Sequence, residues 1–377
     1  MMESIYLDYA ATTPILPEVS AVIEEAHRRY WGNPSSSHRL GREAKQALES
    51  ARATVADAIH AKESEIIFTS GGTESDFLAL SGILLASTKR HLITTSVEHH
   101  AILHNATALH ADHVETTLVS PSNDVATWIT QLELALRHDT GLVSIMWVNN
   151  ETGAVFPISQ IAAFLFERQI PLHTDAVQAL GTFSIDVRKD SVSALSLTAH
   201  KIFGPVGIGA LYVREGTSFQ PRIRGGKQEK NRRAGTENVP LILGFAKAVE
   251  LCTASREAHF QKLLALRTAF LTNLQAALTG ISDHSASEQA PHILNIGFEG
   301  VDNEALLMLL DLSGVFASAG SACSAGAIEP SHVLVALGYE QQEIRSSVRF
   351  SFSPYQSLEE IIEASRVVIR TVQQLRK

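Results

Sequence analysis

The strongest constraint on the fold is an alternation of short apolar runs with helix-like segments. The apolar runs occupy residues 65–69, 91–95, 114–119, 142–148, 170–174, 193–198 and 208–213. A segment with helical character follows each of the first five, the last of these being short and covering residues 176–180. Strands that alternate with helices predict an α/β fold with a mostly parallel sheet covered on both faces. The run at 142–148 is apolar almost throughout, as expected of a strand buried on both sides.

The pattern changes beyond Pro240. Helical spacing covers residues 241–252, 260–278 and 303–312, a strand is expected at 292–298, and the C-terminus is helical from Leu358. We expect a smaller α+β domain with the N-terminal arm packed on it. The predicted division is a large domain over residues 15–254, which begins with helices at 17–30 and 41–59, and a small domain formed by residues 1–14 and 255–377.

Composition excludes several classes of protein. The chain has 377 residues, a net charge of -9 and no run of basic residues, so direct nucleic-acid binding is not expected. No apolar stretch is long enough to span a bilayer, and the N-terminus lacks the pattern of a secretory signal. Only two cysteines occur, which favours a reducing compartment and predicts a cytoplasmic location.

Lys201 stands at the end of the apolar run 193–198, directly after His200. A lysine that is partly withdrawn from water loses its proton more easily and becomes a nucleophile toward carbonyl groups. The functional interpretation is therefore a Schiff-base lysine. The alternative is a surface lysine on a hairpin, and this stretch alone does not separate the two.

Polar residues follow five of the predicted strands. They lie at residues 70–75, 98–100, 149–153, 175–178 and 198–201. Open parallel sheets bind ligands beyond the carboxyl ends of their strands. One polar strand end is usually only a turn, whereas five that converge on one region predict a ligand site.

The types of residue at these ends suit one cofactor. Gly71, Gly72 and Thr73 open a helix whose first turn could bind phosphate, and Thr73 with Asp76 has the spacing of a capping box. Asp175 ends a strand, where a carboxylate needs a cationic partner such as a pyridinium N–H. Together with a lysine these groups specify pyridoxal phosphate. Taken singly, the glycines could be an ordinary helix start and Asp175 an ordinary helix cap.

The histidines and cysteines permit further hypotheses. His99 could stack on a flat ring, while His100 and His104 have a metal-ligand spacing but no nearby acidic or thiol ligand, so no metal site is predicted. Cys323 lies among small residues, which predicts an exposed cysteine on a mobile loop. Cys252 lies in an apolar helix and is expected to fill the core.

One arginine could bind substrate. Arg349 lies in an alternating, strand-like segment and could hold a carboxylate through two hydrogen bonds, although a surface position is equally compatible with the pattern. The polar loop 232–238 is turned by Gly235 and looks suited to contact a ligand or partner.

These motifs, taken in order, resemble the cysteine desulfurases of the NifS/IscS kind, which are fold-type I pyridoxal-phosphate enzymes. The motifs are Leu7-Asp-Tyr-Ala-Ala-Thr-Thr-Pro14, Ser70-Gly-Gly-Thr-Glu74, Glu98-His-His100, Asn149-Asn-Glu-Thr-Gly153, His173-Thr-Asp-Ala-Val-Gln178, Ala199-His-Lys201, Arg233-Ala-Gly-Thr-Glu-Asn238 and Gly320-Ser-Ala-Cys-Ser324. The resemblance covers essentially the whole chain. It implies a large domain with a seven-stranded sheet and a smaller α+β domain that carries the catalytic cysteine.

The resemblance also implies a role for each matching residue. Lys201 would hold the cofactor and move protons, His99 would stack on its ring, and Cys323 would be the nucleophile. Arg349 would bind the carboxylate of L-cysteine. The cofactor would further be held by Asp175 at the ring nitrogen, Gln178 at the ring oxygen, Asn150 near the ring and the substrate, and Gly72, Thr73, Thr198 and His200 at the phosphate. Thr236 would reach the phosphate of the neighbouring subunit in a homodimer.

The implied reaction converts L-cysteine to L-alanine. It leaves a persulfide on Cys323, which passes to an acceptor protein of iron–sulfur cluster assembly or tRNA thiolation. A selenocysteine lyase, another class-V aminotransferase and a catalytically silent sulfur-relay scaffold remain alternatives. Three departures from the family pattern occur: Tyr9 replaces Asn, Thr198 replaces Ser, and Lys227 replaces a third glycine after Gly225 and Gly226.

Overall fold

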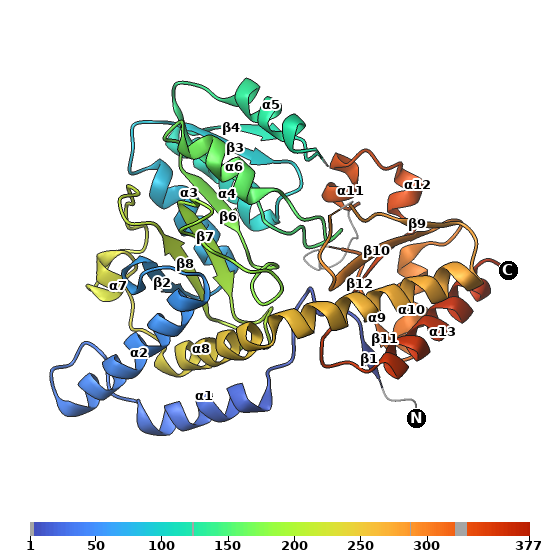
Figure 1. Ribbon diagram of the computed structural model, residues 1–377, viewed down its shortest axis with the longest axis horizontal. Helices are drawn as coiled ribbons and strands as arrows, with labels where there is room; N and C mark the ends of the chain where they lie inside the picture. Colours follow the sequence, from blue (N-terminus) through green and yellow to red (C-terminus); the bar gives the residue numbers. More distant parts are fainter. Residues whose placement is uncertain (1–3, 123, 287, 321–329) are drawn as a thin grey trace. The chain divides into compact units, whose positions relative to one another are not determined.

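The structure is a computed structural model that describes residues 4–122, 124–286, 288–320 and 330–377 (Figure 1). The chain divides into two compact units. The sheet unit comprises Thr13–Trp147 and Phe156–Arg256, and the small unit comprises Met1–Thr12, Val148–Val155 and Glu257–Lys377. The predicted division placed residues 148–155 in the large domain. Whether the two predicted domains fold independently within these limits stays a prediction.

The sheet unit contains seven strands that form one sheet. They are β2 (Ile66–Thr69), β3 (His91–Thr95), β4 (Glu115–Val119), β5 (Thr140–Ser144), β6 (Leu172–Asp175), β7 (Ala194–Thr198) and β8 (Gly209–Val213). The helices are α1 (Pro17–Arg29), α2 (Arg39–Ala58), α3 (Gly72–Leu84), α4 (His100–Ala108), α5 (Val125–Ala135), α6 (Ile158–Phe166), α7 (Gln228–Asn231) and α8 (Val239–Ala254), with short 3-10 turns at Glu63–Glu65 and Leu109–Asp112.

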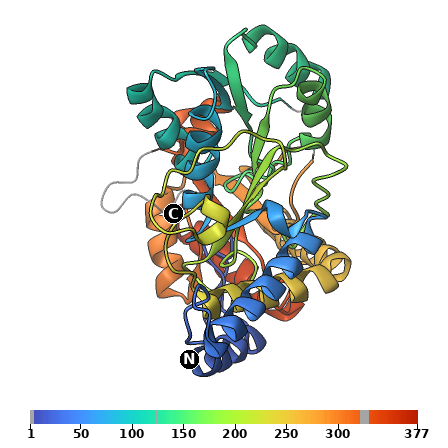
Figure 2. The ribbon, with the colours of Figure 1, turned by 90° about the vertical axis from the view of Figure 1, so that its left-hand side faces the viewer.

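The strand order confirms the predicted mostly parallel sheet. The order is β2-β8-β7-β6-β5-β3-β4, and only β8 runs antiparallel to its neighbours. Every residue of β2, β3, β5, β6, β7 and β8 is buried, whereas the edge strand β4 is partly exposed. Helices cover both faces (Figure 2), which explains why the inner strands are apolar rather than alternating.

Two predicted boundaries are wrong. Strand β5 covers Thr140–Ser144 instead of 142–148, although the N–H groups of Ile145 and Trp147 still bond to β6 carbonyls before Val148 bridges to Val155. The short helix expected at 176–180 is a series of turns. One turn forms, with the Leu180 N–H bonded to the Ala176 carbonyl, but Gly181 takes a positive φ of 86°, so the backbone then leaves the helical conformation.

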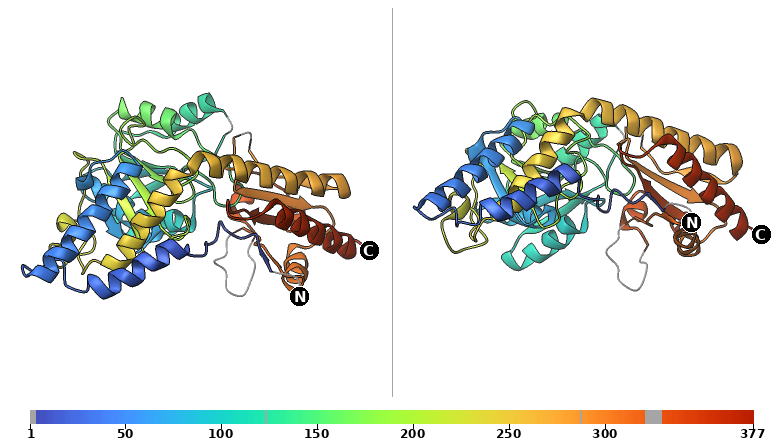
Figure 3. Two further views of the ribbon diagram at one scale, coloured as in Figure 1. Left: turned by 60° about the horizontal axis from the view of Figure 1, so that its bottom comes forward. Right: turned by 90° about the horizontal axis from the view of Figure 1, so that it is seen from below.

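The helices at the start of the chain pack on α8. Figure 3 shows α1 and α2 beside α8 in the sheet unit. The approach is close at Gly244, where a Cβ atom would lie 2.6 Å from the Ile23 side chain. In the part of the chain that the structure describes, no helix combines the length and the apolar character needed to cross a membrane.

The small unit is built from short strands and long helices. The elements are β1 (Ile5–Tyr6), α9 (Arg256–Ala277), β9 (Ile281–Asp283), β10 (Ile293–Phe298), α10 (Asn303–Leu312), β11 (Val315–Phe316), α11 (His332–Ala336), α12 (Gln341–Ile344), β12 (Ser347–Ser351) and α13 (Leu358–Leu375). Strands β12, β10 and β9 form an antiparallel sheet, and β1 pairs with β11. This pairing confirms that the N-terminal arm packs on the C-terminal residues.

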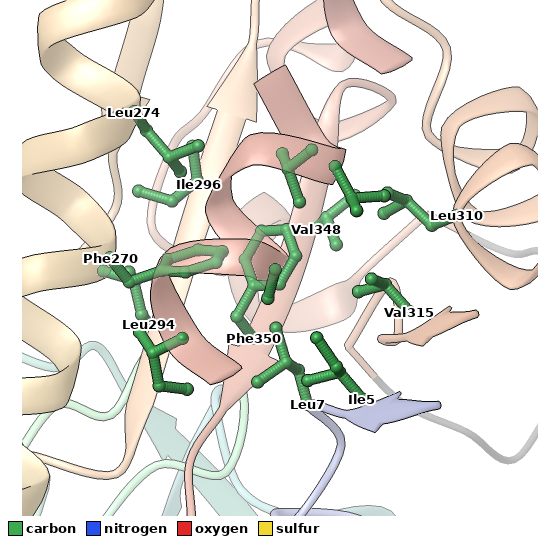
Figure 4. Packing of buried hydrophobic residues seen from close by; sticks show 14 of the residues in the cluster. Ile5, Leu7, Phe270, Leu274, Leu294, Ile296, Leu310, Val315, Val348 and Phe350 are labelled. Carbon is green, nitrogen blue, oxygen red and sulfur yellow. The ribbon is translucent and has the colours of Figure 1, made fainter. Parts of the chain in front are cut away.

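An aromatic and aliphatic core holds the small unit together (Figure 4). Phe270 of α9 contacts Phe350 of β12 with ring centroids 4.9 Å apart, and both side chains are fully buried. Leu7 of the N-terminal arm belongs to the same core and is fully buried. Burial of such side chains contributes about 1.5–3 kcal/mol each, so the arm is an integral part of this unit.

Candidate active site

The end of β2 forms a tight backbone cradle. The turn approaches β8 so closely that a Cβ atom on Gly209 would lie 2.8 Å from the Gly71 Cα atom, and one on Gly72 would lie 2.9 Å from the Val177 side chain. The cradle opens into α3, whose first N–H groups have no acceptor within the helix and favour an anion. The predicted capping box is absent, because α3 begins at Gly72 and Gly71 makes no side-chain cap.

Asp76 has a different environment from the one predicted. It is 1% exposed, and within the described residues its Oδ1 atom accepts no hydrogen bond. Burial, followed by the charge of Asp175, raises the pKa of Asp76 well above its ordinary value. The neighbouring His173 has its Nε2 atom 3.7 Å from the same Oδ1 atom, and burial lowers the pKa of His173 to about 3, so this imidazole is neutral.

Asp175 and Lys201 lie at the ends of the paired strands β6 and β7. Asp175 is 7% exposed and its Oδ1 atom accepts the Val177 N–H at 2.9 Å. Burial raises the pKa of Asp175 to about 6, while the Val177 N–H and the charge of Lys201 act in the opposite direction. Since no regular helix follows, Asp175 is not a helix cap, and its carboxylate is held by the local turn at Val177.

Of the other predicted cofactor residues, Thr198 lies beside the cradle. It is 1% exposed, and its Oγ1 atom would lie 3.8 Å from a Cβ atom placed on Gly71. His200 is half-buried, and burial followed by the charge of Lys201 lowers its pKa to about 4, so the ring is neutral near pH 7. Gln178, three residues after the end of β6, is buried at 7% exposure. The roles of His200 and Gln178 stay predictions.

His99 caps α4 and carries a defined tautomer. Its Nδ1 atom accepts the Ala101 N–H at 3.1 Å, so the proton of the neutral ring lies on Nε2. His100 and His104 stack with centroids 4.9 Å apart and an interplanar angle of 4°. Within the described ranges, no group of three or more metal-ligating side chains is found.

Glu98 has a fully buried carboxyl group, and the sequence analysis predicted no role for it. It accepts a hydrogen bond from the Thr95 hydroxyl at 2.7 Å and from the Met146 N–H at 3.0 Å. Burial raises its pKa to about 8 despite these bonds. Glu98 therefore lies directly before His99 as a group that holds a proton through neutral pH.

Glu98 should make the stability of the protein depend on pH. Its folded pKa of about 8 exceeds the ordinary value of 4.5, so its contribution is complete below 4.5 and is lost as the pH rises through 8. We expect Glu98→Gln to flatten this decline by a few kcal/mol, measured by urea unfolding of the cofactor-loaded protein at about pH 5 and about pH 9. Glu24→Gln, on a side chain 70% exposed, is the control, and equal slopes in all three proteins would contradict the assignment.

Arg349 lies in β12 of the small unit and is 2% exposed, so the surface interpretation is wrong. Its Nη1 atom donates to the Asn150 carbonyl at 2.8 Å, and its Nη2 atom donates to the Asp8 carboxylate at 2.7 Å. Within the described residues its Nε atom has no hydrogen-bond partner. A guanidinium has five N–H donors, so Arg349 retains donors for a carboxylate ligand.

Asn150 lies in a turn that its neighbour Asn149 stabilises. The Asn149 side-chain oxygen accepts hydrogen bonds from the Glu151 N–H at 3.0 Å and from the Thr152 N–H at 2.9 Å. The turn belongs to the small unit, together with Arg349. Of the five polar strand ends that were predicted to converge, four lie at the carboxyl edge of the sheet, and the fifth, residues 149–153, is part of the other unit.

The loop that carries Thr236 is fixed by charged contacts within the sheet unit. Arg233 donates to both carboxylate oxygens of Glu74, at 2.8 and 3.1 Å, and Thr236 is exposed. Lys227, which replaces the third glycine, has a φ of -89° that any residue adopts. The left-handed conformation falls instead on Glu229, Lys230 and Asn231, so α7 is a turn of opposite hand rather than a regular helix.

The structure describes one of the two cysteines, Cys252. Cys252 is 7% exposed, and burial raises its pKa to about 12, which confirms an inert core cysteine. Cys323 lies outside the described residues, as does its predicted mobile loop. The described residue that precedes this segment is Gly320, and the main chain two residues earlier, at Ser318, bridges to Arg349.

The sequence analysis did not identify the partner of Arg349 or the contacts of Glu151. Asp8 and Glu151 lie inside two of the motifs, but no role was predicted for either residue. A buried arginine needs a carboxylate partner, so a prediction that Arg349 is buried would also have predicted such a partner. No local pattern could have identified Asp8, which is separated from Arg349 by 341 residues in the sequence.

Comparison with known proteins shows which class this arrangement represents. A sequence model of the Aminotransferase class-V family matches residues 5–363, so the chain belongs to the class-V aminotransferases, which have the fold-type I architecture. Within that class it is a cysteine desulfurase. It is 42% identical over 377 residues to cysteine desulfurase IscS of Methanosarcina thermophila, a match that covers 99% of this chain and 93% of that protein. It is 43% identical to putative cysteine desulfurase IscS 1 of Bacillus subtilis strain 168, in a match that covers 99% of this chain and 100% of that protein.

Solved structures agree with this assignment. A NifS-like protein superposes with a TM-score of 0.91 at 30% identity, covering 98% of this chain and 100% of that chain. The structure of SspA in complex with cysteine superposes with a TM-score of 0.82 at 35% identity, covering 94% and 100%. Membership of this enzyme class implies dependence on pyridoxal phosphate.

Proposed function

We propose that Lys201 and Asp175 hold pyridoxal phosphate, with the Lys201 amine bonded to the cofactor and the Asp175 carboxylate paired with its ring nitrogen. The observation that carries this proposal is the placement of the two groups at one edge of the sheet: Asp175 ends β6 and is buried, and Lys201 follows β7, the strand paired with β6. A buried carboxylate with a raised pKa is stabilised by a cationic N–H, which a protonated pyridine ring supplies. The residues present therefore fit the cofactor.

The phosphate would be held by the glycine cradle at the start of α3. The narrow approach at Gly72 and the exposed start of α3 at Thr73 leave backbone N–H groups for an anion, and Thr198 lies beside the cradle. The remaining contacts are assigned to His200 at the phosphate, Gln178 at the ring oxygen, His99 on the ring face and Asn150 near ring and substrate. Thr236 would serve the phosphate of a second copy in a homodimer.

Binding and proton transfer would then be the work of this chain's own residues. Pyridoxal phosphate supplies an electron sink for the charge left when the Cα proton of the substrate is removed. Lys201, once its amine is free, would take and return that proton. The Nε2–H group of His99 would donate a proton, since its Nδ1 atom already accepts the Ala101 N–H.

Arg349 would bind the carboxylate of L-cysteine. Its guanidinium is held in place through Asp8 and the Asn150 carbonyl, which leaves N–H donors for the ligand and fixes their direction. SspA, which resembles this chain at 35% identity, was solved in complex with cysteine. Cysteine as the substrate of this chain agrees with that likeness.

Cys323 would accept the sulfur. Its thiolate attacks the substrate sulfur, a new S–S bond forms, and the substrate Cβ–S bond breaks with its electron pair remaining on carbon. Two protons complete the product, so L-cysteine and the thiol become L-alanine and a persulfide on Cys323. The persulfide sulfur then passes to an acceptor protein, for which iron–sulfur cluster assembly and tRNA thiolation are the candidates, in the cytoplasm. The comparisons give no support to a selenocysteine lyase, another class-V aminotransferase or a silent scaffold.

A burst experiment tests this function. The cofactor-loaded enzyme, mixed with L-cysteine but no added reductant, should release about one alanine per chain in a fast first turnover and then slow down. The slow phase is expected because the persulfide must be removed by the thiol of free L-cysteine before the next turnover. Adding dithiothreitol should accelerate alanine release and produce sulfide in equal amount. Alanine release that continues at its first rate without any reductant or acceptor would exclude a protein-bound persulfide.

A further inference from the structure

Glu151 is a buried carboxylate whose contacts lie on both sides of the segment that contains Cys323. Its side chain is fully buried, and its Oε2 atom accepts a hydrogen bond from the Ser331 hydroxyl at 2.5 Å. The same oxygen lies against Gly320, where an added Cβ atom would be only 2.5 Å away. Gly320 and Ser331 are close to the two limits of the undescribed segment 321–329, and all three residues belong to the small unit.

Each end is adapted to this carboxylate. Gly320 has a φ of 120°, which favours glycine, and its lack of a side chain permits the close approach. The Ser331 hydroxyl donates to Glu151 and also accepts the Leu334 N–H at 3.1 Å, so it caps α11 while it holds the carboxylate. A hydrogen bond to an ionised acceptor is roughly twice as strong as one between neutral groups.

The backbone of Glu151 is also held by hydrogen bonds. The Glu151 N–H donates to the Asn149 side chain, and the Glu151 carbonyl accepts from the Asn295 side chain at 3.3 Å. Its second oxygen, Oε1, has no hydrogen-bond partner within the described residues. A buried carboxylate with an unpaired oxygen destabilises a fold. Packing alone would be served as well by an apolar side chain, so the polar group is better explained by its contacts with the two ends.

We propose that Glu151 is a positioning residue that fixes the two ends of the Cys323 segment and thereby sets the rate at which Cys323 takes the substrate sulfur. This inference rests on the proposed role of Cys323. Its side chain acts through Ser331 on one side and through contact with Gly320 on the other, while the adjacent Asn150 carbonyl binds Arg349.

The test compares Glu151→Ala, Glu151→Gln and Ser331→Ala in the cofactor-loaded enzyme. We expect Glu151→Ala to lower the rate of alanine release by about tenfold, and the other two by a smaller factor, because Gln keeps a neutral acceptor and Ser331→Ala leaves the Gly320 contact. The cysteine-induced change in cofactor absorbance should keep its midpoint within about twofold, since substrate binding precedes sulfur transfer. Ser365→Ala, a buried serine of α13 bonded to Asn273, is the control for loss of a buried hydroxyl in the same unit.

Hydrogen exchange supplies the readout that a general loss of stability would not move. Peptides that cover residues 315–320 and 330–336 should exchange faster in Glu151→Ala, with no change at β10 or α13. Adding Ser331→Ala to Glu151→Ala should lower the rate of alanine release little further, because both remove the same hydrogen bond, whereas exchange at 330–336 should rise further because the Leu334 cap is also lost. A slower enzyme with unchanged exchange at these ends, or an enzyme of native rate, overturns the inference. Alanine release by Cys323→Ala in the same assay would contradict the proposed function itself. That result is distinguishable from failure of the inference, because it does not depend on the Glu151 variants.

Discussion

Replacement of Cys323 by alanine should lower alanine release from L-cysteine by a factor of roughly 10³ or more. Without the thiolate no group remains to accept the substrate sulfur, so the Cβ–S bond cannot be broken by transfer. The cofactor should stay bound with its native absorbance, because none of the residues assigned to it changes. The measurement is alanine formed with dithiothreitol present, together with the absorbance spectrum.

Cys252→Ala is the matched control for this prediction. Cys252 is buried and its pKa is raised to about 12, so its removal should leave alanine release within about twofold of the native rate. Cys323→Ser tests whether a hydroxyl of similar size can substitute, and it should not. Equal alanine release by Cys323→Ala and the native enzyme would show that Cys323 is not the nucleophile and would favour a lyase acting on another substrate.

Lys201→Ala should produce the other large effect. Removal of the amine eliminates the covalent link to the cofactor and the group that moves the Cα proton, so we expect activity to fall by roughly 10³ or more. Borohydride reduction of the native enzyme should fix the cofactor on the peptide that contains Lys201, as seen by mass spectrometry. The same treatment of Lys201→Ala should leave the protein unlabelled.

Lys227→Ala serves as the control in this second experiment. Lys227 is an exposed residue at a family glycine position, and its ordinary φ indicates no strain. Its replacement should alter neither labelling nor activity by more than about twofold. Cofactor found on a lysine other than Lys201 after reduction would overturn the assignment, even if Lys201→Ala is inactive for another reason.

The elements of the fold were largely predictable because they depend on local spacing. The strands at β2, β3, β7 and β8 were located within a few residues, since each is an apolar run bounded by turn residues. Errors remained at the boundaries of elements. The positive φ of Gly181 limits the segment 176–180 to one turn, and β5 covers Thr140–Ser144 rather than 142–148.

Some errors arose from burial that local spacing does not report. The spacing of Thr73 and Asp76 fits a surface capping box, yet Asp76 is withdrawn from water against Asp175. Likewise, an alternating segment such as that around Arg349 has the same pattern whether its arginine faces solvent or a buried carboxylate. Burial depends on the packing of elements that are distant in the sequence.

The order of elements, the residues at the strand ends and, through the motifs, the family and its cofactor could be predicted from the sequence. Local hydrophobic period and turn chemistry carry that information because they act over a few residues. Contacts between polar side chains that are distant in the sequence became visible in the folded chain. Asp8 reaches Arg349 across 341 residues and Glu151 reaches Ser331 across 180, and these contacts follow from long-range strand pairing and core packing. Burial then sets the pKa values of Glu98, Asp175 and His200, because desolvation depends on the whole fold rather than on neighbouring residues.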